Sequence, residues 1–211
     1  MINIQKYNLG ILVVSFIFIV SACRTVSHED DAIIIHTENS PAVLLTCVDS
    51  VIQHPSGCGM IPVPTDSTSS IQIDMDQNGT FDFSITCSTW YQFVSASGPC
   101  ANYNSSIFIS GSSDSNEIAL GSLYNTAKDF EFGDEIFDEN SWSHISTLQL
   151  HVATAPFQTD FVDEKYVGIR MRSPVGYQYG WILLEKIGFK LYVKSSGIQT
   201  CPTKAIQAGQ F

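Results

Sequence analysis

Oxygen-bearing side chains recur at alternate positions in the segment DMDQNGTFD, which begins at Asp74. Asp74, Asp76 and Asn78 occupy positions 1, 3 and 5 of the calcium-loop pattern, and the glycine at position 6 permits the sharp turn that this pattern needs. Thr80 would offer its backbone carbonyl at position 7, and Asp82 falls at position 9. Because a hard cation prefers oxygen ligands, these five residues are the candidate ligands of a structural Ca²⁺ ion.

The segment departs from the EF-hand pattern at position 12, where Ile85 stands in place of a bidentate glutamate. Its flanks also read as strands rather than helices. A calcium site here would therefore need a carboxylate from elsewhere in the chain. The other interpretation, a hairpin whose aspartates are only solvated, stays open. Three carboxylates brought together on an acidic protein repel one another unless a cation joins them, which favours the ion.

The candidate ligands lie between two stretches of strictly alternating apolar and polar residues. Such alternation on both sides of an Asn78-Gly79 pair predicts a β-hairpin with its turn at that pair. The apolar sets are Ile71, Ile73 and Met75 before the turn and Phe81, Phe83 and Ile85 after it. Because these sets point to a core, we expect the three aspartates on the opposite face or at the turn.

The rest of the chain predicts further short strands and no convincing helix after residue 22. Asn39-Ser40-Pro41 predicts a turn between the first two strands, and residues 111–116 predict another turn. Residues 123–140 lack a clean helical period, and the role of 123–144 stays open. About ten short strands indicate an all-β fold, an antiparallel β-sandwich or jelly roll. The strands expected besides the hairpin are Ala32–Ile35, Val43–Val48, Thr89–Val94, Ser105–Ser110, Glu117–Leu120, Ile145–Ala153, Tyr166–Arg172, Tyr179–Leu184 and Phe189–Lys194.

The N-terminal 22 residues predict a lipoprotein signal peptide. Lys6 supplies a positive n-region, Leu9–Val20 is an apolar run, and small residues lead into Cys23. This arrangement resembles a bacterial lipobox, which implies cleavage before Cys23 and a lipid on its sulfur. The alternative is an ordinary signal peptide cut after Ala22. Residues 23–31 then form a flexible acidic tether, and residues 32–211 form a single β domain.

Charge excludes some partners. Without Lys6, nine Lys and Arg stand against 21 Asp and Glu, a net charge of −12. Such a surface repels nucleic acid and anionic lipid headgroups, so we expect neither as a ligand. The acids at 29–31 resemble the short signal that sends some lipoproteins of Bacteroidota to the outer face. The prediction is a protein anchored to the bacterial outer membrane through Cys23 and exposed at the cell surface, although a simple solvated linker explains the same tripeptide.

Five cysteines follow Cys23, and export to an oxidising compartment permits disulfides between them. Proximity in the sequence favours Cys47–Cys58 and Cys87–Cys100. Either Cys87 or Cys100 could instead reach Cys201, because connectivity does not follow from sequence.

Four motifs carry a resemblance. The sequence IQIDMDQNGTFDF, then YVGIR from Tyr166 and YGWI from Tyr179, then AIQAG ending at Gly209, resemble a loose group of secreted and surface β proteins of Bacteroidota and other environmental bacteria. The similarity covers about Ser70–Asp82 and Tyr166–Gly209. It implies a structural β protein and transfers no established activity.

The alternative hypothesis is that the protein is an enzyme. Glu135 and Asp138 resemble the acidic strand of retaining β-sandwich glycosidases, but acids three residues apart fall on opposite faces of a strand. His144 and His151 are isolated histidines, and Arg170 and Arg172 are expected to pair with local carboxylates.

Aromatic residues near strand ends suggest binding instead, since such rings stack on sugars, although most aromatic side chains belong to cores. We therefore expect non-catalytic adhesion, or binding of a glycan or protein, with a carbohydrate-active enzyme or accessory glycan-binding subunit as the alternative. The aromatic candidates are Trp90, Tyr91, Trp142, Tyr177 and Tyr179.

Overall fold

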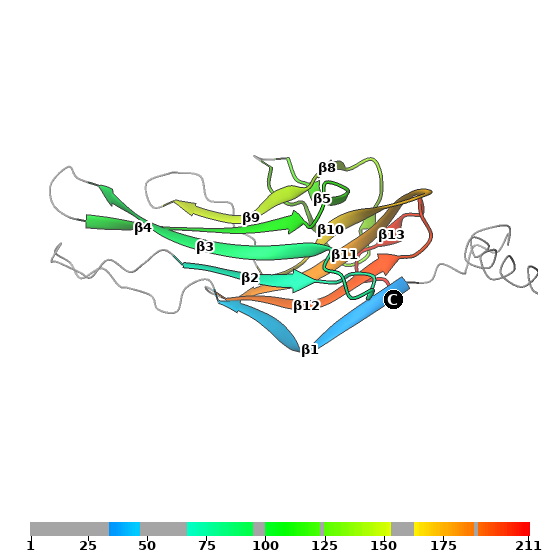
Figure 1. Ribbon diagram of the computed structural model, residues 1–211, viewed down its shortest axis with the longest axis horizontal. Helices are drawn as coiled ribbons and strands as arrows, with labels where there is room; N and C mark the ends of the chain where they lie inside the picture. The colour runs from blue at the N-terminus through cyan, green and yellow to red at the C-terminus, as the bar shows by residue number, and fades with distance from the viewer. Residues whose placement is uncertain (1–33, 47–66, 95–99, 123–124, 153–162, 188–189) are drawn as a thin grey trace, which may run out of the picture. The chain divides into compact units, whose positions relative to one another are not determined.

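The computed structural model describes residues 34–46, 67–94, 100–122, 125–152, 163–187 and 190–211 (Figure 1). These belong to one compact unit, Ile33–Phe211. The predicted signal peptide, Cys23, the acidic tether, Cys47 and Cys58 lie outside the described residues. Within the described part of the chain no helix is long and apolar enough to cross a membrane.

The described residues are all-β and antiparallel, which confirms the predicted fold class. They form thirteen strands, several of them longer than the short strands expected. The strands are β1 (Ile34–Thr46), β2 (Ser67–Ile73), β3 (Phe83–Val94), β4 (Cys100–Gly111), β5 (Asn116–Leu120), β6 (Asp129–Phe130), β7 (Glu135–Ile136), β8 (Ser141–Ser143), β9 (Ile145–Val152), β10 (Asp163–Ser173), β11 (Gly176–Ile187), β12 (Lys190–Gln199) and β13 (Ile206–Gln207).

Two sheets make the sandwich. The larger has the order β1-β12-β11-β10-β5-β8, with β6 also pairing with β10, and the smaller has the order β2-β3-β4-β9 (Figure 1). One buried apolar cluster joins them, with Phe83, Ile85 and Ile109 from the smaller sheet and Ile169 and Leu184 from the larger. Burying the alternate residues of both sheets is the main stabilising contribution.

A second apolar cluster covers the opposite face of the larger sheet. Tyr179 and Trp181 of β11 pack there under Phe130, Ile136 and Ile206. The β7–β13 pair therefore acts as a partial lid on that face. Central strand β11 is consequently buried on both faces, as its apolar YGWILL sequence predicts.

A glycine makes room for the largest ring of this second cluster. Trp181 lies opposite Gly197 in the register of β11 and β12. A Cβ at Gly197 would stand 2.7 Å from two atoms of the indole, so only glycine lets the indole lie across the neighbouring strand.

Two local expectations are wrong. The predicted turn at Asn39-Ser40-Pro41 is a register shift between Glu38 and Val43 inside the single strand β1, since both halves pair with β12. The β2–β3 hairpin exists, but its last pair is Ile73 with Phe83, so residues 74–82 form a nine-residue loop rather than a two-residue Asn-Gly turn.

The predicted Cys87–Cys100 disulfide is also wrong. Cys87 lies opposite Ile107, whereas Cys100 lies opposite Val94 at the far end of the β3–β4 pair. Seven residues of strand separate the two positions, about 23 Å, against about 7 Å for the Cα atoms of a disulfide. Cys87 itself is buried and disulfide-bonded. Cys201 is half-buried after β12, and its N–H donates to the side chain of Gln199.

Candidate functional site

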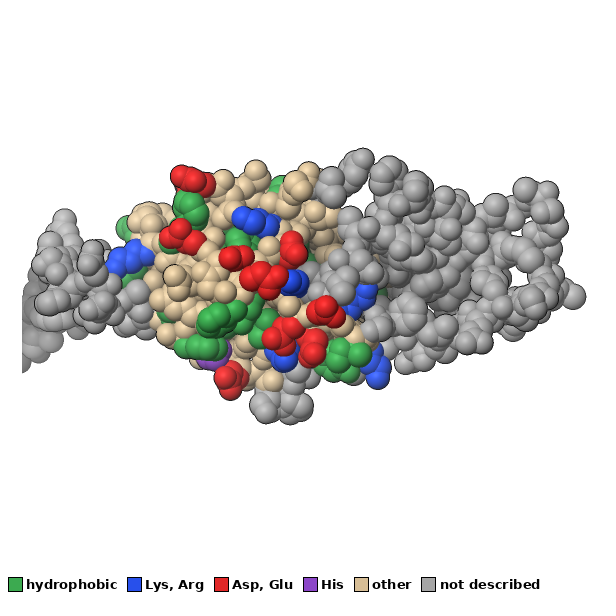
Figure 2. Space-filling model, turned by 180° about the vertical axis from the view of Figure 1, so that it is seen from behind, with side chains coloured by type: hydrophobic (Ala, Val, Ile, Leu, Met, Phe, Trp, Pro, Cys, Tyr) green, Lys and Arg blue, Asp and Glu red, His purple; other side chains and the backbone are tan. Residues whose placement is uncertain are grey.

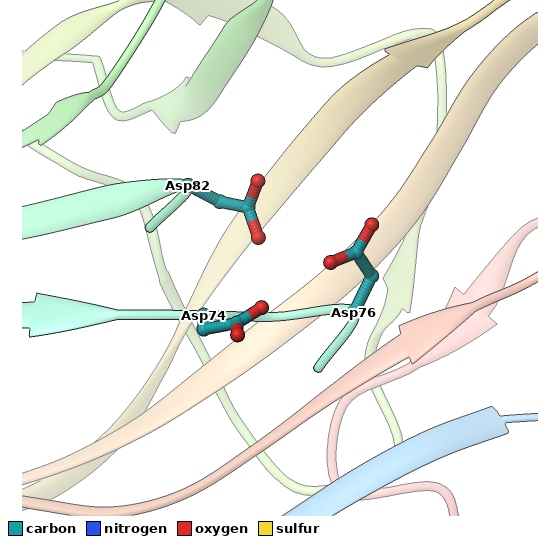
Figure 3. Close-up of side chains that lie close together, drawn as sticks. All are labelled: Asp74, Asp76 and Asp82. Carbon is teal, nitrogen blue, oxygen red and sulfur yellow. The ribbon is translucent and has the colours of Figure 1, made fainter. Parts of the chain in front are cut away.

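The acidic loop, residues 74–82, gathers the three predicted carboxylates. Asp74, Asp76 and Asp82 each offer an oxygen within 4.8 Å of the others, and Figure 3 shows the three side chains converging. Calcium holds oxygens at about 2.3–2.6 Å, so ligand oxygens on opposite sides of one ion lie about 5 Å apart. The spacing of the three carboxylates therefore fits a single calcium ion.

Backbone amides hold these carboxylates in place. Asp74 accepts hydrogen bonds from the N–H groups of Asn78 (3.2 Å) and Gly79 (2.7 Å), and Asp76 accepts a second bond from the Asn78 N–H (3.2 Å). Gln77 and Gly79 adopt positive φ angles of 57° and 86°, which turn the loop tightly enough to aim its amides inward. The loop thus brings negatively charged carboxylates together, and the backbone amides that donate hydrogen bonds to them are uncharged.

The other two predicted ligands lie in the same loop but bond to its own groups. Asn78 Nδ2 donates to Asp76 Oδ2 (2.8 Å), and Asn78 Oδ1 accepts the Thr80 N–H (2.7 Å). The amide oxygen of Asn78 keeps one lone pair for an ion while it bonds to Thr80. Asp74, Asp76 and Asp82 are the core of the candidate site, and Asn78 is an accessory.

Asp82, which the alternation places on the opposite face or at the turn, has a more protected side chain than a solvated hairpin would give it. It is buried, and its carboxylate accepts the Met75 N–H at 2.8 Å. Burial raises the pKa of Asp82 above 3.8, and the negative charges of Asp76 and Asp74 raise it further, while the Met75 hydrogen bond opposes them. A cation would reverse the effect of the two neighbours, since it favours the ionised carboxylate.

The acidic loop also connects other parts of the sandwich. Gln77 Nε2 donates to Thr37 Oγ1 of β1 (2.9 Å), so the loop bridges the two sheets. The Asp82 carbonyl accepts bonds from the Ser112 N–H (2.7 Å) and from Asn116 Nδ2 (3.0 Å), which fixes the turn between β4 and β5. An ion in the loop would consequently brace both sheets.

A second charged cluster, the arginine clamp, lies on the larger sheet. Arg170 of β10 stacks between the rings of Tyr177 (3.9 Å from guanidinium carbon to ring centroid) and Trp142 (4.7 Å). It also forms ion pairs with Glu117 and Asp138, both at 2.7 Å. The prediction that Arg170 pairs with local carboxylates is confirmed, and the clamp ties edge strand β8 to the sheet.

The clamp bears on two expectations from the sequence: the aromatic residues proposed for binding and the acidic pair proposed for catalysis. The facing sides of Trp142 and Tyr177 are occupied by Arg170, and Tyr179 is buried. Exposed Glu135 lies in β7, whereas Asp138 follows that strand and is bound by Arg170, so the two acids form no shared acidic strand.

The remaining candidate residues from the sequence do not join either cluster within the described part of the chain. His144 is exposed, and Arg172 lies 6.0 Å from the ring centroid of Tyr177. The side chains of Trp90, Tyr91 and His151 lie outside the described residues.

Sequence reasoning missed an aromatic array on the same face of the larger sheet. It runs Phe132–Tyr166–Trp181–Phe211, with ring centroids 6.5, 5.4 and 6.0 Å apart in turn. His36 of β1 meets Phe211 edge-on at 4.4 Å. The alternation in β11 places Trp181 on this face, but Phe132 and Phe211 lie outside regular strands and leave no periodic signal.

Comparison with known proteins assigns no family: no family model matches the chain, and neither a curated protein nor a solved structure does.

Proposed function

We propose that the protein is a lipid-anchored component of the bacterial outer membrane that acts at the cell surface by binding a glycan or a protein. The single observation that supports binding is the aromatic array, because Phe132 and Phe211 are 73% and 72% exposed while packing in a continuous row of rings. Large apolar side chains grouped on a surface mark interaction sites. Cys23 carries the lipid in this proposal.

Calcium has a structural role in the proposal. The convergence of Asp74, Asp76 and Asp82 supports an ion in the acidic loop, and the bond from Gln77 to Thr37 would transmit its effect to β1. The ion would hold the loop that bridges the two sheets, and it would take no part in a reaction.

The alternative function is a carbohydrate-active enzyme or its accessory subunit. Asp138 is one of the two acids on which a glycosidase interpretation depends. It forms an ion pair with Arg170, which itself lies between two aromatic rings. A catalytic acid must be free to contact its substrate, whereas the Asp138 carboxylate is engaged in an ion pair with Arg170. The clamp therefore supports a structural carboxylate and favours binding over hydrolysis.

The test separates anchoring, binding and catalysis. The full chain and its Cys23→Ala variant are expressed in a bacterium and fractionated, and only the unsubstituted chain is expected in the outer-membrane fraction. Residues 24–211 are then incubated with a panel of polysaccharides and with surface proteins of other cells. We expect retention on one of these ligands without release of reducing sugar. Release of reducing sugar would establish the enzyme and overturn the proposal.

A further inference from the structure

The exposed rings of Phe132 and Phe211 form one surface with Tyr166 and Trp181, which lie between them in the aromatic array. We call this surface the aromatic patch. Phe132 contacts Tyr166 and Phe211 contacts Trp181, so the exposed rings rest on buried or half-buried ones. Phenyl rings this exposed lose apolar burial that a folded monomer could otherwise gain. The patch therefore indicates a surface that a partner covers.

The patch is held in a fixed arrangement. Two backbone hydrogen bonds join the Phe132 loop to the C-terminal segment: Gly133 N–H to the Ala208 carbonyl (2.9 Å) and Ala208 N–H to the Asp134 carbonyl (2.8 Å). Gly209, at φ 77°, lies so close that a Cβ would stand 2.6 Å from the Phe132 ring. Because these rings are already ordered, a partner would bind without a large conformational cost.

Stability alone does not explain this packing. Beneath Phe211, Trp181 Nε1 and His36 Nε2 are buried with no hydrogen-bond partner among the described residues. A buried polar atom without a partner costs about 1–3 kcal/mol, so the sequence keeps these rings together at some cost to the fold. Such a cost is expected where a surface serves recognition.

Acidic side chains border the patch. Glu131, Asp134 and Glu135 are exposed in the segment that carries Phe132, and Glu38 is exposed two residues beyond His36 on the same face of β1. Figure 2 shows acidic side chains gathered beside apolar ones over the described part of the molecule seen from behind. Within the described part of the chain, only Glu131 among these four forms an ion pair, with Lys165. The border of the patch therefore carries excess negative charge.

We infer that the aromatic patch docks a basic segment of a partner protein, with an apolar side chain against Phe132 and Phe211 and Lys or Arg side chains against the acidic border. Aromatic anchors inside a charged rim are the usual anatomy of a protein interface. A second copy of this chain would bring a net charge of −11 and be repelled. Phenyl rings also lack the polar group with which Tyr and Trp bond to sugars. The inference rests on the proposed binding function and names its partner class.

The test uses two synthetic twelve-residue peptides, one alternating Lys with Leu and one alternating Glu with Leu, titrated into the full chain by calorimetry. We expect the lysine peptide to bind, more weakly at high salt, and the glutamate peptide not to bind. The double variant Phe132→Ser/Phe211→Ser should weaken binding about tenfold or more. Val175→Ser is the matched control because Val175 is 72% exposed on the β10–β11 turn, and it should bind as the unsubstituted chain does.

Each other outcome overturns the inference. Equal binding of both peptides, or equal loss in the Val175→Ser control, would show that the patch recognises nothing specific. Unchanged binding by the double variant, with an unaltered melting temperature that shows it folds, would place binding elsewhere. If a neutral polysaccharide instead loses binding only in the double variant, the partner class is wrong while the proposed binding function stands. Release of reducing sugar would overturn that function separately.

Discussion

The acidic loop and the arginine clamp both bring carboxylates together, but they neutralise them differently. In the clamp, Arg170 lies between two rings and pairs with Glu117 and Asp138. In the acidic loop, Asp74 and Asp76 accept bonds from backbone and amide N–H groups, none of which carries a charge. The clamp thus contains its own cation, and the loop does not.

This difference shows in the electrostatics. Asp82 has a raised pKa, to which its two acidic neighbours contribute after burial. In the clamp, Arg170 supplies a positive charge that compensates such repulsion. A self-neutralised cluster should depend on one side chain, whereas an uncompensated one should respond to ions and to pH.

The largest effect is expected from removing the cation of the clamp. Arg170→Ala should lower the free energy of unfolding by about 3 kcal/mol, because it leaves Glu117 half-buried without its partner and removes the stacking between Tyr177 and Trp142. Urea denaturation measures the change. Arg172→Ala, on the same strand but exposed, should change stability by about 0.5 kcal/mol or less. Similar losses in both variants would contradict the clamp.

A smaller effect is expected from calcium in the acidic loop. Calcium at about 100 times its Kd should stabilise the fold by about 2.7 kcal/mol, which raises Tm by about 5–10 °C over the value in chelator. Differential scanning calorimetry measures the shift. Asp76→Asn should abolish the shift, while Asp138→Asn in the clamp should keep it. No shift in the unsubstituted chain would leave the loop an ordinary turn.

A third variant asks whether the clamp needs a planar cation. Arg170→Lys keeps the charge but gives up the flat guanidinium that stacks on two rings and bonds to two carboxylates at once. We expect a loss of about 1 kcal/mol in urea denaturation, between the values for Arg170→Ala and the unsubstituted chain. A lysine variant as unstable as the alanine variant would assign the stabilisation to geometry, and one as stable as the unsubstituted chain would assign it to charge alone.

Much of the fold could be predicted from alternation in the sequence. Val167, Ile169 and Met171 share the buried face of β10 as their spacing predicts, with Arg170 on the other side. Local patterns failed where long-range pairing decides the outcome. Asn39-Ser40-Pro41 has turn composition, yet pairing with β12 on both sides keeps it within one strand.

The candidate site was predictable to a similar extent. The spacing of Asp74, Asp76 and Asp82 identified carboxylates that do converge, because these residues lie in one loop. The spacing could not show that Asp82 is buried, since its environment comes from Met75, Asn116 and the core beneath them. The clamp joins β5, β8, β10 and β11, and no local pattern links residues so far apart in the chain.

The smallest effect expected is a pH dependence that belongs to the acidic loop. In chelator, the raised pKa of Asp82 means that the folded state binds a proton more tightly than the unfolded state, whose carboxyl titrates near 3.8. Stability due to Asp82 should therefore rise as pH falls from neutral through the raised pKa, and the gain should be complete below 3.8. Asp82→Asn removes this titration, so the unsubstituted chain should gain stability relative to the variant on acidification. Urea denaturation of both chains at a series of pH values measures the difference.

In calcium the trend should reverse, because the ion favours the ionised carboxylate and protons compete with it. A constant difference between the two chains from neutral pH to 3.8 would mean that neither burial nor the two acidic neighbours raise the pKa of Asp82, and the contrast between loop and clamp would then lack its electrostatic basis.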